Sequence, residues 1–116
     1  MKKLHKECKA LWREAVIKKW GFYCEFCGAP AQDAHHFIVK SRCNNLRYDV
    51  LNGVPLCRNH HFVIHGNTHD TLTRRDIEDK IIKGRGRKWI NYIRKNAPKK
   101  VKVNKQWLEK TIKQLQ

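Results

Sequence analysis

Two pairs of metal-binding side chains are separated by about thirty residues. Cys24 and Cys27 form the first pair, Cys57 and His60 form the second, and each pair encloses two residues. This spacing lets one tight turn direct both side chains at one ion, and zinc accepts thiolate and imidazole in a tetrahedral shell. An isolated Cys-x-x-Cys would also suit a redox pair. The second pair favours a structural zinc ion bound by three cysteines and one histidine.

A histidine-rich group is interleaved with these pairs, because five of the seven histidines lie between positions 35 and 65. His35 and His36 are adjacent at the start of a predicted strand, so they point to opposite sides of it. One could bind a metal ion while the other faces a substrate. His61 and His65 are four residues apart, which puts both on one face of a helix. The alternative is that some of these are ordinary polar side chains beside a zinc ribbon.

The central elements that position these residues are short. An apolar stripe at helical spacing predicts a helix over residues 1–20. Short apolar runs at 37–39 and 54–56 predict two strands, and a short helix is expected over about 58–65. The chemistry-bearing residues therefore fall on strands, on one helix and in the turns between them.

Helical patterns return after this central region. Thr73 and Asp76 have the spacing of a helix cap, and Gly84 and Gly86 interrupt the apolar stripe that follows. A last helix is predicted to begin at Asn104. The chain of 116 residues fits one domain, with a core at about 20–66 and basic helical flanks at 1–20 and 74–116.

The charge distribution indicates a polyphosphate partner. The net charge is +16, of which residues 1–20 carry +5, residues 21–82 carry zero and residues 83–116 carry +11. Basic flanks suit nucleic acid, since each neutralised phosphate releases counterions, whereas the alternative is a solvated basic surface. No apolar run is long enough for a bilayer and no apolar signal core follows Met1, so we expect no membrane partner and a cytoplasmic location. The oligomeric state is left open.

The order of these motifs resembles a known family. Residues 34–38, then 52–57, then His60, His61 and His65 are similar to the H-N-H endonuclease motif in its phage and bacterial version, where Cys-x-x-Cys knuckles flank the site. The resemblance covers roughly residues 20–66. Phage recombination nucleases of the NinG type are distantly similar through the same core. His60 departs from the pattern, because the family usually has a fourth cysteine there.

The resemblance implies a fold and a set of roles. The fold is α+β, a ββα-metal (His-Me finger) core with zinc knuckles, flanked by N- and C-terminal helices. His36 corresponds to the general base that activates water, and Asn52 to the residue that holds the loop beneath it. His35, His61 and His65 correspond to the ligands of a catalytic divalent ion.

The expected function is metal-dependent endonucleolytic cleavage of DNA, by nicking or double-strand cutting, with loose sequence specificity. The cofactors are structural Zn²⁺ and a catalytic divalent ion, Mn²⁺, Mg²⁺, Ni²⁺ or Zn²⁺, although an all-imidazole set suits Mg²⁺ least. The predicted DNA-binding side chains are Lys40, Arg42, Lys99, Lys100 and Lys102. The alternatives are a zinc-ribbon DNA-binding module without catalysis, a NinG-like phage recombination nuclease, and an RNA-binding or RNA-modifying protein.

Overall fold

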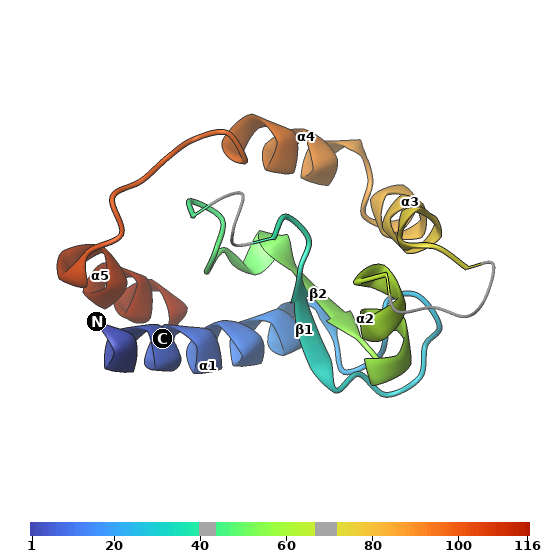
Figure 1. The fold of residues 1–116 in the computed structure, drawn as a ribbon, viewed down its shortest axis with the longest axis horizontal. Helices are drawn as coiled ribbons and strands as arrows, with labels where there is room; N and C mark the ends of the chain where they lie inside the picture. Colours follow the sequence, from blue (N-terminus) through green and yellow to red (C-terminus); the bar gives the residue numbers. More distant parts are fainter. Residues whose placement is uncertain (40–43, 67–71) are drawn as a thin grey trace.

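A small antiparallel sheet lies between a long N-terminal helix and a short helix that carries the histidine pair (Figure 1). The computed structural model describes residues 1–39, 44–66 and 72–116, so Lys40 and Arg42 lie outside the described residues. Within these ranges the fold class is α+β. The elements in chain order are α1 (Lys2–Trp20), β1 (Asp33–His36), the 3-10 helix η1 (Val50–Asn52), β2 (Gly53–Leu56), α2 (Arg58–Ile64), α3 (Arg74–Arg85), α4 (Arg87–Asn96) and α5 (Lys105–Leu115).

The register of the sheet assigns the two adjacent histidines to opposite faces. Asp33 pairs with Leu56 and His36 pairs with Gly53, and side chains alternate along β1. Asp33 and His35 share the face that contacts α2. His36 shares the other face with Ala34, which packs in the cluster beneath α1.

The first strand begins and ends earlier than the apolar pattern predicts. The predicted strand is present and contains His35 and His36, but it ends there and residues 37–39 follow it, so the predicted position was wrong. Phe37 is apolar because the segment after β1 packs on the core, with its ring 4.8 Å from that of Trp89 in an edge-to-face contact. Burial of a loop and burial of a strand leave the same short apolar signal.

The predicted helix ends agree well with the structure. Thr73 and Asp76 form a reciprocal capping box at the start of α3, and the side chain of Asn104 caps α5. Gly84 lies inside α3, whereas Gly86, with a φ of 95°, separates α3 from α4. None of the described helices is both long and apolar enough to cross a membrane.

Two apolar clusters hold the elements together. One joins α1 to α5 through residues such as Cys8 and Leu108, and the other joins the sheet and α2 to α3 and α4. Trp20 packs against both clusters. Where α1 crosses β2, a Cβ on Gly53 would lie 2.1 Å from a methyl group of Val16, so only glycine allows this approach.

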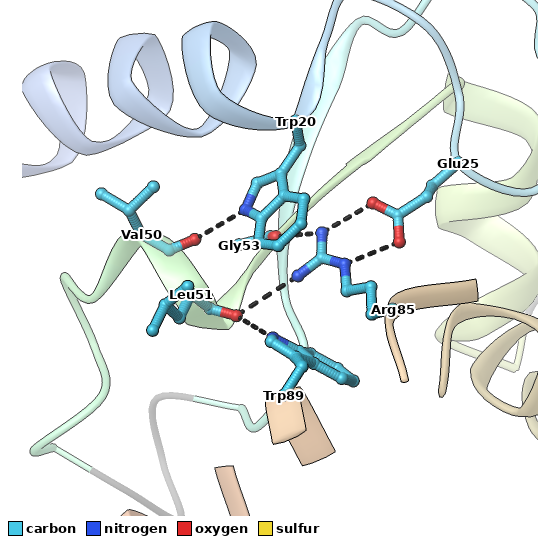
Figure 2. Close-up of polar contacts among 7 residues, drawn as sticks. All are labelled: Trp20, Glu25, Val50, Leu51, Gly53, Arg85 and Trp89. Carbon is cyan, nitrogen blue, oxygen red and sulfur yellow. Dashed lines mark hydrogen bonds and ion pairs between the residues drawn. The ribbon is translucent and has the colours of Figure 1, made fainter. Parts of the chain in front are cut away.

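A buried guanidinium connects α3 to the loops around the sheet (Figure 2). The side chain of Arg85 is 3% exposed and makes a bidentate ion pair with Glu25, with N–O distances of 2.7 and 2.6 Å. It also donates to the carbonyl oxygens of Leu51 at 3.3 Å and Gly53 at 2.7 Å. One side chain therefore ties the end of α3 to the segment after α1 and to the start of β2.

Two indole rings flank this guanidinium. The carbon Cζ of Arg85 lies 3.5 Å from the ring centre of Trp20 and 4.8 Å from that of Trp89. Both indoles donate to η1, Trp20 to the carbonyl of Val50 and Trp89 to that of Leu51. The guanidinium is removed from water, but each of its three nitrogens donates to an oxygen atom.

Replacing Arg85 with Ala is expected to reduce the free energy of unfolding by about 3 kcal/mol or more. The change leaves the carboxylate of Glu25 without its cation and removes two hydrogen bonds to carbonyl oxygens. The matched control on the same helix is Arg75→Ala, whose pair with Asp79 is exposed. That control should change stability by about 0.5 kcal/mol or less. Denaturant titration of the two variants checks this, and equal losses would contradict it.

Candidate metal centres and the histidine cavity

The two Cys/His pairs meet at one point. The ligand atoms of Cys24, Cys27, Cys57 and His60 all lie within 4.8 Å of one another, and the group could hold a metal ion. The Sγ atoms of Cys27 and Cys57 are 3.8 Å apart, and Nδ1 of His60 lies 3.2 Å from Sγ of Cys57 and 3.8 Å from Sγ of Cys24. Two sulfurs at about 2.3 Å from zinc in a tetrahedron are about 3.8 Å apart, so the spacing suits that shell.

Tight turns hold both halves of this group. Gly28 has a φ of 79° and donates its N–H to the carbonyl of Cys24 at 2.8 Å, closing the first turn. Cys57 is the N-cap of α2, so the second pair lies where β2 turns into that helix. The N–H of Glu25 donates to the carbonyl of Pro55 and joins the first turn to β2.

The second group gathers three imidazoles from β1 and α2. The ligand nitrogens of His35, His61 and His65 lie within 4.8 Å of one another, and the group could hold a metal ion. The Nε2 atoms of His61 and His65 are 3.1 Å apart, close to the separation of about 3.4 Å for two nitrogens on one tetrahedral ion. Nε2 of His35 is buried and has no hydrogen-bond partner among the described residues. A cation is the partner that would satisfy it.

The electrostatics favour the neutral form of His35 and of His65. Burial, reinforced by the neighbouring His61 and His65, lowers the pKa of His35 to about 3. Burial and His61 also lower the pKa of His65, and Arg74 adds to the effect on both. Neutral imidazole has the lone pair that a metal ligand needs, so His35 is ready to bind a cation without first losing a proton.

Asp33 orients one member of the trio and was not among the predicted site residues. Its carboxylate accepts a hydrogen bond from Nδ1 of His61 at 3.1 Å, which leaves the lone pair of the neutral ring on Nε2. Asp33 also lies 3.8 Å from the guanidinium of Arg58. The signal was available, because a residue two positions before His35 shares its face of a strand.

His36 faces the same cavity from the other side of β1. Its Nε2 donates to the carbonyl of Arg47 at 2.8 Å, so the lone pair of the neutral ring is on Nδ1. Its ring stacks on the indole of Trp12 at a centroid distance of 4.1 Å. His35 and His36, with His61 and His65 from α2, line one cavity of about 340 Å³.

Asn52 is fully buried and ties together the two ends of the loop after β1. Its Oδ1 accepts from the N–H of Ile38 at 2.8 Å, and its Nδ2 donates to the carbonyls of Ile38 and Leu46. The whole amide is thereby used on backbone groups at the two ends of the loop. This is the geometry of a side chain that holds a loop in position.

The predicted DNA-binding lysines lie away from the cavity. Lys99, Lys100 and Lys102 are exposed in the connection between α4 and α5, and none lines the cavity. Lys9 and Arg47 line it instead, and the sequence analysis identified neither. They are brought in by packing of α1 and of the segment before η1, which leaves no spacing pattern in the sequence.

The chain matches no protein-family model, no curated protein and no solved structure. The interpretation of the site therefore rests on its own geometry and chemistry.

Replacing Asp33 with Ala is expected to weaken binding of added Ni²⁺ or Mn²⁺ at the three-histidine group by about 10–100-fold, because His61 loses the acceptor that orients it. Calorimetric titration of protein whose Cys/His group is already loaded with zinc measures this. Arg58→Ala is the control, since it removes the other partner of Asp33 and leaves the contact with His61. Equal affinity in the Asp33 variant and the parent would show that the carboxylate does not support the ligand.

Proposed function

We propose that the protein is a metal-dependent endonuclease of the H-N-H type that hydrolyses phosphodiester bonds in DNA. One observation carries this proposal. His36, with its lone pair on Nδ1, and the trio of His35, His61 and His65 line the same cavity of about 340 Å³. A purely structural zinc ribbon needs only the Cys/His group and has no use for four more histidines around a cavity.

The reaction needs a base for the attacking water and relief of the charge that develops on the phosphoryl group. His36 accepts the proton of that water at Nδ1, while its Nε2–H stays bonded to the carbonyl of Arg47 and keeps the ring in one orientation. Stacking on Trp12 restricts the ring further. A divalent ion bound by His35, His61 and His65 would offset phosphoryl charge and stabilise the leaving oxygen.

The elements support the ββα-metal reading of the fold. β1 carries His35 and His36, β2 follows Asn52, and α2 carries His61 and has His65 as its C-cap, in that chain order. The group of Cys24, Cys27, Cys57 and His60 is proposed to bind structural Zn²⁺, which would fasten the turn before β1 to the start of α2. Zinc binding at such a group contributes directly to folding.

DNA is the proposed substrate because of the excess positive charge of +16 and the phosphate chemistry of the cavity. Contacts to the phosphate backbone position a protein without reading the sequence, so loose specificity is expected. A competition assay with unlabelled RNA tests the choice of DNA. Preferential inhibition by RNA would move the assignment to an RNA substrate.

Purified protein is expected to hold about one tightly bound Zn²⁺ per chain, measured by elemental analysis. Cys27→Ser should lose this zinc and a large part of its stability, since ligand binding here is folding energy. Cys8→Ala is the control, because Cys8 is buried between α1 and α5 and should leave the zinc content unchanged. Absence of zinc, with full helicity kept in strong chelator, would contradict the proposal.

His36→Ala is expected to lower the rate of nicking of supercoiled plasmid by about 10²-fold or more, the usual effect of removing a general base. Zinc content and DNA affinity should persist. His65→Ala is the comparison, and its cleavage should instead require higher concentrations of Mn²⁺ or Ni²⁺. If the parent binds plasmid but never cuts it with any divalent ion, the protein is a zinc-dependent DNA-binding module and the enzymatic proposal fails.

A further inference from the structure

A second depression continues from the histidine cavity along α1. It has a volume of about 610 Å³ and is lined by four lysines of the first helical turns, Lys2, Lys3, Lys6 and Lys9. It shares Lys9, Arg47 and Tyr48 with the histidine cavity, so the two depressions form one groove. We call it the α1 groove.

The α1 groove is strongly and uniformly positive. Four lysines and Arg47 line it, and no carboxylate of the described residues lines either of its two parts. Lys6 and Lys9 are exposed and three residues apart on the helix, and Lys2 is four residues before Lys6, so these three share one face. Such a face suits an extended polyanion.

The dimensions suit a nucleic acid strand. Lys2 and Lys9 are seven positions apart, which corresponds to a rise of about 10 Å at 1.5 Å per residue. Along one DNA strand phosphates recur about every 3.4 Å of axis, so the groove spans about three of them. The positive face can therefore contact a short run of consecutive phosphates. A free phosphate or a single nucleotide would fill only part of it.

The floor of the groove is fixed relative to His36. Tyr48 is 6% exposed, its hydroxyl lies 2.7 Å from Nδ1 of His5, and the guanidinium of Arg47 lies 5.4 Å from the centre of its ring. The backbone carbonyl of Arg47 accepts the hydrogen bond from His36. One residue therefore supplies both the acceptor that orients the proposed base and a cation at the junction of the two depressions.

We propose that the α1 groove binds the strand that contains the scissile phosphate, an inference that rests on the nuclease function proposed above. Arg47 and Lys9 contact the phosphate next to the one that is cut, and Lys6 and Lys2 contact those that follow. In this proposal the groove is the main phosphate-binding surface, in place of the exposed Lys99, Lys100 and Lys102 between α4 and α5, which line neither depression.

The test compares two lysine pairs of equal charge and equal spacing. Lys6→Gln with Lys9→Gln alters the groove, and Lys110→Gln with Lys113→Gln alters an exposed face of α5 that lines neither depression. Affinity of the zinc-loaded protein for a labelled duplex is measured by anisotropy over a range of salt concentrations. The groove pair should reduce the slope of log K against log salt by about 2, and the α5 pair should leave it unchanged.

A second readout locates the groove next to the cut. The parent is assayed on duplexes shortened in steps on either side of the cleaved bond. Removing the last three phosphates on one side should raise KM for the parent with little change in kcat. The variant with both groove substitutions should already have the higher KM and should not respond to this shortening.

The outcomes separate the two proposals. If the parent cuts DNA but the groove pair behaves as the α5 pair does, the α1 groove is wrong and the nuclease assignment stands. The same conclusion follows if the triple change of Lys99, Lys100 and Lys102 to Gln has the full effect instead. If the groove pair weakens binding while the parent never cuts, the groove is a DNA-binding surface, but the nuclease assignment and the placement of the groove beside a scissile phosphate both fail.

Discussion

The bidentate pair between Arg85 and Glu25 is the constraint on which the arrangement of the site depends. A guanidinium that is 3% exposed is costly to desolvate, and the fold meets this cost with a carboxylate, two carbonyl oxygens and two indole faces. The oxygen partners belong to three places: the turn that carries Cys24 and Cys27, the 3-10 helix η1, which ends at Asn52, and the start of β2. The two indoles belong to α1 and α4. Through these contacts Arg85 holds in place both the turn of the Cys/His group and the segment that ends at Asn52. The guanidinium is planar and rigid, so its hydrogen bonds hold these parts of the chain in one relative position.

The sheet is small, but because side chains alternate along β1, its two faces carry different histidines. His35 lies on the face that α2 covers, where burial keeps it neutral and brings it to His61 and His65. His36 lies on the face that α1 covers, where Trp12 and the carbonyl of Arg47 hold its ring. At the end of β1, both faces border a common cavity. Two adjacent residues in the sequence thus reach the same space from opposite sides, with different partners and different proposed roles.

The parts that could be predicted from the sequence are those with a local signature. Helix caps at Thr73 and Asn104 depend on residues three apart, and the two metal-binding groups depend on spacings of two or four residues and on chain order. The strand at 37–39 was misplaced because its apolar residues pack as a buried loop against Trp89. Asp33 was missed although its position relative to His35 was informative. Lys9 and Arg47 could not be found, since only the packing of α1 and of the segment before η1 brings them to the cavity.

The positive charge around the cavity has two consequences that support each other. Burial is the largest cause of the lowered pKa of His35 and of His65, and the cation of Arg74 adds to it, so both rings favour the neutral form that a metal ligand requires. The same sign of charge attracts phosphates, and the groove along α1 extends it away from the cavity without an intervening carboxylate from the described residues. Asp33 lines neither part of the groove, and its carboxylate contacts His61 and Arg58 on the α2 side. Negative charge is thereby kept where it orients a ligand and away from the path proposed for the strand.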